Sequence, residues 1–202
     1  RMLRCFGRGG EEEVWMVLLL GVDNAGASTA LNALRPAPHR NKPPPTAIGV
    51  EKSVMKMNTT DANGGKKSHI SVELLNVAGS EKSRALWKTY LPLANALLFI
   101  IDASDAERVP EAREELHKLS FREKHMDARA VADPVHIPLA VLANKTDVHG
   151  SMTPAEIEDV LDIRLLPYQT TKVFASNAIT GEGVHEALHW IASFFGQDEV
   201  DR

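Results

Sequence analysis

An apolar run passes directly into a glycine-rich loop at residues 14–28, VWMVLLLGVDNAGAS. Val14–Leu20 has the length and continuous apolar character of a strand that is buried on both faces. Gly21 and Gly26 lie five residues apart, the spacing of a loop whose backbone N–H groups cradle phosphate oxygens at the start of a helix. Such a loop continues with lysine and then serine or threonine, but here Ala27 stands in the lysine position and Ser28 follows it. The segment therefore predicts a phosphate site that lacks its usual cation.

Short apolar runs alternate with helical patterns along the rest of the chain. Strands are expected at Ala96–Ile101, Pro138–Ala143 and Lys172–Ala175. Helices are expected from Ala30, over Glu107–Leu119, after Thr153 as a capping residue, and along the stripe Val184, Leu188, Ile191 and Phe195. This alternation is typical of an α/β fold with a parallel sheet and helices on both faces.

One stretch departs from this alternation. Ser53–Met57 and Ile70–Leu74 alternate between apolar and polar residues, and Asn63-Gly64-Gly65 lies between them. This pattern predicts a hairpin with a long tip. We therefore expect a six-stranded, mostly parallel sheet with one antiparallel edge strand.

Composition limits the class of protein. A chain of 202 residues is the size of one domain, expected over residues 1–202 with its core at about 14–195. The net charge of −4 argues against a partner made of nucleic acid. The single cysteine, Cys5, forms no internal disulfide, which favours a cytoplasmic location. Cys5 is either an exposed thiol or the site of one acyl chain, so membrane association is expected to be peripheral and weak at most.

A second motif follows the strand expected at Pro138–Ala143. It reads Asn144-Lys145-Thr146-Asp147. An aspartate carboxylate in this setting accepts two hydrogen bonds from the edge of guanine, which adenine does not offer. The lysine stem packs along the base, and the asparagine ties this loop to the phosphate loop. The alternative interpretation is a solvated turn after a strand.

Together these segments resemble the ordered motifs of the Ras-like small GTPases, and of their ADP-ribosylation-factor (Arf/Arl) branch in particular. The resemblance is carried by Gly21–Gly26, Asn76-Val77-Ala78-Gly79, Ser80–Tyr90, Phe99–Asp105, Asn144–Asp147 and Asn177-Ala178, and it covers roughly Val14 to Phe195. It implies a Ras-like P-loop domain that binds GTP or GDP.

The resemblance also implies roles for individual residues. The nucleotide-binding positions are Asp23, Asn24, Ala25, Gly26, Ala27, Ser28, Thr29, Gly79, Asn144, Lys145, Asp147, Asn177 and Ala178. Ser28 and Thr46 are the positions of the Mg²⁺ ligands, and Val50, Leu75, Trp87 and Tyr90 those of an effector surface on the switch and hairpin segments. Trp87 has a second interpretation, as a core residue. The implied partners are regulatory or effector proteins, in signalling and in vesicle or ciliary trafficking.

Four departures from the family pattern concern the phosphates and Mg²⁺. Ala27 replaces the lysine, Asn76 replaces the metal-holding aspartate, and Ser80 stands where the family has the glutamine that orients water. The segment Pro45–Val50 has one residue more than the corresponding segment of the family, which leaves the assignment of Thr46 as a metal ligand open. Loss of one charge-assisted contact weakens binding roughly 10- to 150-fold. We expect weak nucleotide binding, a doubtful Mg²⁺ site and no catalytic residues.

These departures leave three functional interpretations open. The first is a regulatory protein that binds guanine nucleotide and hydrolyses little or none of it. The second is a nucleotide-free pseudo-GTPase that acts purely as an interaction module. The third is an active GTPase whose partner supplies the missing groups. Lys42, Lys82 and Arg84 are candidates for a replacement cation.

Overall fold

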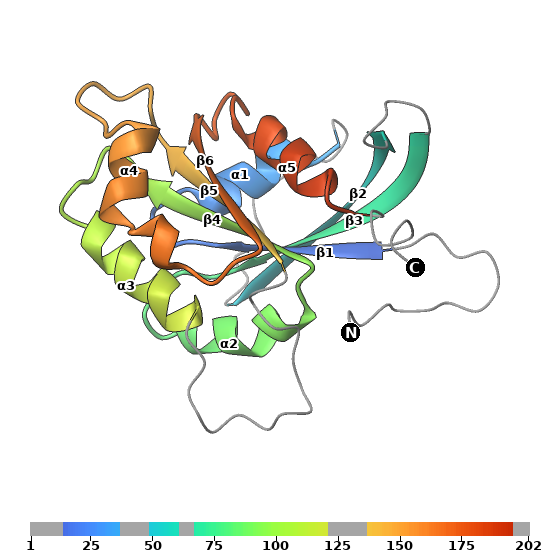
Figure 1. Ribbon diagram of the computed structural model, residues 1–202, viewed down its shortest axis with the longest axis horizontal. Helices are drawn as coiled ribbons and strands as arrows, with labels where there is room; N and C mark the ends of the chain where they lie inside the picture. The colour runs from blue at the N-terminus through green and yellow to red at the C-terminus, as the bar shows by residue number, and fades with distance from the viewer. Residues whose placement is uncertain (1–13, 37–48, 61–66, 121–136, 196–202) are drawn as a thin grey trace.

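The computed structural model of this chain describes residues 14–36, 49–60, 67–120 and 137–195 (Figure 1). The strands are β1 (Val14–Leu20), β2 (Val50–Thr60), β3 (Lys67–Val77), β4 (Ala96–Asp102), β5 (Pro138–Asn144) and β6 (Thr170–Ser176). The α-helices are α1 (Ala27–Leu34), α2 (Trp87–Tyr90), α3 (Val109–Ser120), α4 (Pro154–Val160) and α5 (Val184–Ala192). Short 3₁₀ turns are η2 (Arg84–Leu86), η3 (Leu91–Leu93) and η5 (Ile163–Leu165).

The strands form one sheet of six in the order β2-β3-β1-β4-β5-β6. β2 pairs antiparallel with β3, whereas every other neighbouring pair is parallel. The chain therefore has the six-stranded, mostly parallel sheet expected from its sequence, with β2 as the antiparallel edge strand. Because β1 and β4 are neighbours with crossovers on opposite sides, the loops after their carboxyl ends meet beside one another, where ligands bind in such sheets.

Helices cover both faces of the sheet (Figure 1). α1 and α5 lie together on one face, and α2 and α3 lie on the other, with α4 beside α3. The central strands are consequently buried throughout: every residue of β5 and all but Asp102 of β4 are buried. Burial on both faces is the physical reason that these strands read as continuous apolar runs. None of the described helices is long and apolar enough to cross a bilayer.

Local signals explain where several elements begin and end. The hydroxyl of Thr153 accepts a bond from the Glu156 amide, and the Glu156 carboxylate accepts one from the Thr153 amide, so the predicted capping box of α4 is confirmed. α3 begins at Val109, two residues later than expected, because Arg108 bonds back to the Asp105 carbonyl in a turn. α5 ends at Ala192, before the last residue of its predicted stripe.

An ion pair inside the fold was not foreseen. The guanidinium of Arg35, at the end of α1, bonds to the carboxylate of Glu51 in β2, and both side chains are almost fully buried. Breaking such a pair leaves an uncompensated buried charge, which costs about 3–5 kcal/mol. The pair joins the helix that follows the phosphate loop to the edge strand of the sheet.

Candidate functional site

The phosphate loop joins β1 to α1, and its shape depends on its glycines. Gly26 has φ of 101°, in the left-handed region that side chains disfavour, and its carbonyl accepts the first helical bond from the Ala30 amide at 2.8 Å. A Cβ atom on Gly21 would lie 2.5 Å from the carbonyl oxygen of Ile100 in β4. The loop predicted from sequence is therefore present at the junction of strand and helix.

A second loop closes onto the phosphate loop from the end of β3. The carbonyl oxygen of Gly79 accepts a bond from the Asp23 amide at 3.2 Å. A Cβ atom on Gly79 would lie 1.9 Å from the carbonyl oxygen of Gly21. Only glycine permits this approach, so the backbone of the segment that follows β3 (residues 78–86, named the switch segment below) rests directly on the phosphate loop.

Asn144, at the end of β5, connects three loops. Its Nδ2 donates to the Ala25 carbonyl at 2.8 Å, and its Oδ1 accepts from the Ala178 amide at 2.9 Å. The side chain is only 2% exposed, so both bonds lie away from water. The predicted tie between the second motif and the phosphate loop is confirmed, and the loop at Asn177-Ala178 is held by the same amide.

The next residues of the motif differ in how firmly they are held. Lys145 has φ of 65°, and its ammonium lies 2.6 Å from the Asp102 carboxylate at the end of β4. Burial opposes ionisation of Asp102, but hydrogen bonds from Lys145 and Ser104 outweigh it and hold the pKa of this carboxyl below its ordinary value. Asp147 is exposed, and its carboxylate is open to solvent. The fixed lysine and the open aspartate lie in one short loop.

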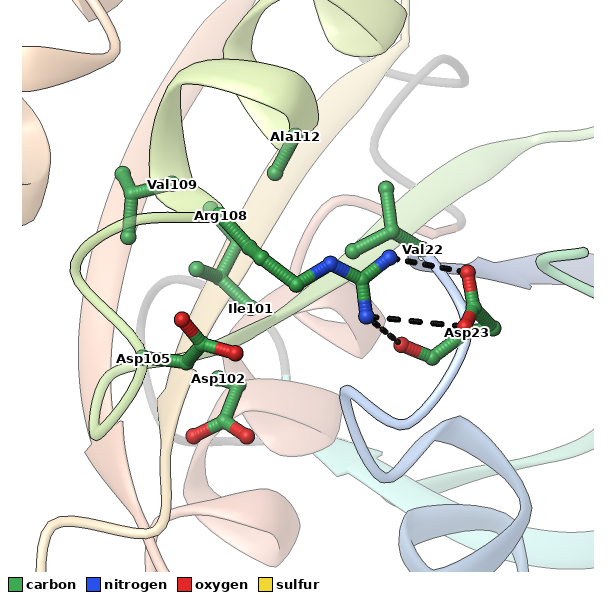
Figure 2. Close-up of a pocket in the computed structure, with 8 residues that line it drawn as sticks. All are labelled: Val22, Asp23, Ile101, Asp102, Asp105, Arg108, Val109 and Ala112. Carbon is green, nitrogen blue, oxygen red and sulfur yellow. Dashed lines mark hydrogen bonds and ion pairs between the residues drawn. The ribbon is translucent and has the colours of Figure 1, made fainter. Parts of the chain in front are cut away.

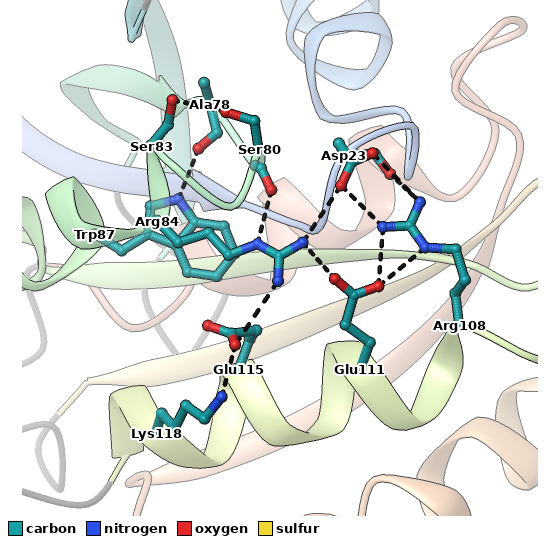
Figure 3. A network of polar contacts seen from close by, with 11 residues as sticks. Asp23, Ala78, Ser80, Ser83, Arg84, Trp87, Arg108, Glu111, Glu115 and Lys118 are labelled. Carbon is teal, nitrogen blue, oxygen red and sulfur yellow. Dashed lines mark hydrogen bonds and ion pairs between the residues drawn. The ribbon is translucent and has the colours of Figure 1, made fainter.

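Asp23, predicted to bind nucleotide, contacts two arginines, Arg108 (Figures 2 and 3) and Arg84 (Figure 3). Arg108 donates to the Asp23 carboxylate at 2.8 Å and to its carbonyl at 2.9 Å. Arg84 lies 3.3 Å from the same carboxylate and 2.6 Å from that of Glu111. Hydrogen bonding from Arg108 lowers the pKa of Asp23, and hydrogen bonding from Arg84 lowers the pKa of Glu111. The Asp23 carboxylate therefore joins the phosphate loop to the switch segment and α3.

Arg84 is therefore not a free replacement for the missing lysine in this arrangement. Its Nε donates to the Gly79 carbonyl at 2.8 Å, and its side chain, 10% exposed, also contacts Glu111 and Glu115 of α3. Lys82 is exposed, and Lys42 lies outside the described residues. Among the three candidate cations, Arg84 is therefore already paired with carboxylates.

Sequence reasoning missed Asp102, Glu111 and Arg108 as members of this region. They lie in the segment from the end of β4 to the first turn of α3. Asp102 and Arg108, with Val22 and Asp23, line a cavity of about 10 Å³, shown in Figure 2. This volume holds about one water molecule. The signal that was available is a run of charges at the carboxyl end of a strand, beside the phosphate loop.

At the start of α1 the hydroxyl of Ser28 faces Asn76, the last residue but one of β3. Asn76 Nδ2 donates to Ser28 Oγ at 3.0 Å, and Asn76 is 5% exposed. Ser28 and Asn76, two of the positions that the resemblance associates with Mg²⁺, are thus adjacent. Thr46, the other expected metal ligand, lies outside the described residues, as do Cys5 and the hairpin tip.

The expected effector surface is only partly exposed. Leu75 is 6% exposed and Trp87 is 1% exposed, and the indole Nε1 of Trp87 donates to the Ala78 carbonyl at 3.0 Å. The expectation that these two side chains form a contact surface is therefore wrong in this conformation, because both belong to the core. Val50 and Tyr90 are half-buried and remain candidates.

A phosphate loop after β1, a motif that ties it to the end of β5, and a switch segment at the end of β3 define the small GTPase class. The sequence profile of the ADP-ribosylation factor family matches residues 5–195, and the chain belongs to this family.

Individual relatives agree with this assignment. The chain is 34% identical over 173 residues to human ADP-ribosylation factor-like protein 4C, which covers 85% of this chain and 82% of the relative. It also resembles the solved structure of the Arl6 small GTPase of Trypanosoma brucei with a bound nucleotide analogue, with a TM-score of 0.67 and 27% identity. That match covers 88% of this chain and 95% of the solved one.

Proposed function

We propose that this chain is a regulatory protein that binds GDP or GTP weakly and hydrolyses GTP little or not at all. The observation that carries the proposal is the position of Asn144, whose buried amide holds the phosphate loop and the loop at Ala178 together. A bridge of this kind prearranges a base site and a phosphate site at a fixed separation. Prearrangement reduces the entropy lost on binding.

Guanine is the base that the chemistry of this loop favours. The exposed carboxylate of Asp147 is an acceptor only, so it pairs with the two N–H donors of the guanine edge. The ammonium of Lys145 is fixed by Asp102, and we expect its aliphatic stem to pack along the base. The nucleotide-binding positions we propose are those given above, with Asp23 acting through its backbone rather than its carboxylate.

Little hydrolysis is expected because the groups that stabilise phosphoryl transfer are missing together. Ala27 supplies no charge, Asn76 supplies no carboxylate, and the Ser80 hydroxyl is too short to orient water and lies 2.9 Å from that of Ser83. Phosphoryl transfer depends on positioning and electrostatic stabilisation, so losing these parts removes most of the rate. By analogy with its relatives, the protein would act in the cytoplasm or at membrane surfaces by binding effectors in signalling or trafficking.

The contacts of Arg84 favour a second candidate function, a nucleotide-free interaction module. In that case the set of carboxylates and arginines around Asp23 would hold the switch segment in one conformation without a ligand. The protein would then present a constant surface to its partner.

Titration calorimetry with GDP and ADP separates the two. We expect GDP to bind in the micromolar range and ADP at least tenfold more weakly, because adenine lacks the paired donors. Asp147→Ala is expected to lose most GDP binding, whereas Asp159→Ala on the exposed side of α4 is a matched control that retains it. No heat with either GDP or GTP at high micromolar concentration would favour the interaction module instead.

A further inference from the structure

The side chain of Asn76 is buried but incompletely paired. It donates one hydrogen bond, to Ser28 Oγ at 3.0 Å, while its Oδ1 has no partner among the described residues. Buried amides normally have their hydrogen-bonding capacity satisfied. The residue is 5% exposed and lies beside Ser28 in the first turn of α1, so an amide with unused hydrogen-bonding capacity stands at the start of this helix.

The residues around Asn76 do not fit Mg²⁺. This cation requires oxygen ligands in octahedral geometry and is usually held through one or two carboxylates. Ser28 Oγ accepts a hydrogen bond from Asn76, so this hydroxyl has one lone pair left and is a single neutral oxygen ligand at most. Within the described part of the chain, no three His, Cys, Asp or Glu side chains are grouped to hold a metal. The carboxylates of Asp23 and Asp102 are paired with Arg108 and Lys145.

The same amide is well suited to an anion. Nitrogen and oxygen of an asparagine exchange places by rotation of about 180° around its last side-chain bond. In one orientation Nδ2 has a second N–H beyond the one given to Ser28. In the other, the Ser28 hydroxyl donates to Oδ1 and both N–H groups become available. Only the second orientation both pairs the oxygen and leaves donors for an anion, so it is the one that suits a phosphate.

Charge favours the same conclusion. The side chains of Ala27, Ser28 and Asn76 are all neutral, so a phosphate meets no negative charge from them. A carboxylate in place of the Asn76 amide would repel a phosphate unless a cation lay between the two. A neutral donor needs no such cation.

We propose that Asn76 donates directly to the phosphate groups of the nucleotide, so that binding does not require a divalent metal. The inference rests on the proposed guanine-nucleotide binding and states how the phosphates are recognised. Ser28 acts as the positioning partner, because its hydroxyl accepts from the amide or donates to it as the side chain rotates.

The test is a set of GDP titrations of the full chain in two buffers, one with about 5 mM MgCl₂ and one with excess EDTA. The MgCl₂ concentration is about fiftyfold above that of a typical 0.1 mM protein sample. For the unmodified protein we expect the two dissociation constants to agree within about twofold. Asn76→Ala should bind roughly tenfold or more weakly in both buffers, since a charge-assisted bond is lost. Asn76→Asp, which keeps the size of the side chain, should bind still more weakly in EDTA and recover about tenfold in Mg²⁺.

Each outcome has a distinct meaning. If the unmodified protein binds GDP in preference to ADP but loses tenfold or more in EDTA, the inference is overturned while the proposed function stands. If Asn76→Asp behaves like the unmodified protein in both buffers, direct donation by the amide is also refuted. If GDP binds in neither buffer, the proposed function fails and the inference fails with it. Thermal unfolding of each variant verifies that a weakened affinity does not reflect an unfolded chain.

Discussion

Replacement of Asn144 by alanine tests the bridge on which the proposed site depends. The substitution removes two buried hydrogen bonds and leaves the carbonyl of Ala25 and the amide of Ala178 without partners. An unsatisfied buried group costs about 1–3 kcal/mol, so with two such groups the free energy of unfolding should fall by about 2–6 kcal/mol. For a domain of this size, that loss lowers the melting temperature by roughly 4–24 °C.

The measurement is thermal and urea unfolding followed by circular dichroism, together with GDP titration of the folded variant. Affinity for GDP should fall more than tenfold even well below the melting temperature, since the two loops are no longer held together. Asn32→Ala is the matched control: Asn32 lies on α1, and its side-chain oxygen is buried without a partner among the described residues. Alanine is also the better helix former, so this variant should be unchanged or slightly more stable.

An Asn144→Ala protein that melts within 2 °C of the unmodified chain, against the roughly 4 °C minimum expected for two lost buried bonds, would refute the reasoning. Equal destabilisation by the Asn32 substitution would also contradict it, because the effect would then reflect the loss of any buried amide.

Three further predictions follow from burial and charge. Burial raises the pKa of Tyr168 to about 12, so the folded state resists ionisation of this phenol. The free energy of unfolding should therefore decline as pH rises from about 10 towards 12. Tyr168→Phe should remove this pH dependence, which urea unfolding at about pH 8 to 11 measures. Gly79→Ala should lower the melting temperature far more than Gly150→Ala, where the φ of 82° strains alanine but its Cβ meets no atom within 4 Å. Equal losses would show that the close approach of Gly79 is not needed. Hydrogen bonding from Arg108 lowers the pKa of Asp23, so its contribution to stability is present above about pH 4 and is lost at lower pH. Asp23→Asn should therefore be less stable than the unmodified chain at pH 7 and should lose less stability between pH 5 and 2, which acid unfolding measures.

The fold was predictable because each central strand can be recognised from its own sequence as a continuous apolar run. β1, β4 and β5 are buried on both faces, so their sequences are continuously apolar and their positions could be assigned with small errors. Ends of elements were less certain. β2 and β3 extend well beyond the predicted hairpin strands, because pairing between backbones continues where the alternation of side chains no longer shows it.

Part of the site was predictable for a similar reason. The tie from Asn144 to the phosphate loop follows from a local motif at the end of one strand, and the structure has it. The contacts of Asp23 with Arg108 and Arg84 join residues that are 85 and 61 positions apart. No local pattern encodes such partners, since charged residues are common on surfaces and their pairing depends on which loops the sheet brings together.

The order of elements, the glycine positions of the phosphate loop and the absence of its lysine were fixed by the amino-acid sequence alone. They depend on hydrophobic periodicity and on backbone conformations that particular residue types allow. Only the tertiary structure decided that Trp87 and Leu75 are core residues, that Arg84 is held by carboxylates, and that the Asn76 amide lies beside Ser28 with its oxygen unpaired. The physical reason is that burial and pairing of side chains arise between segments distant in sequence, and they exist only once the sheet has set those segments side by side.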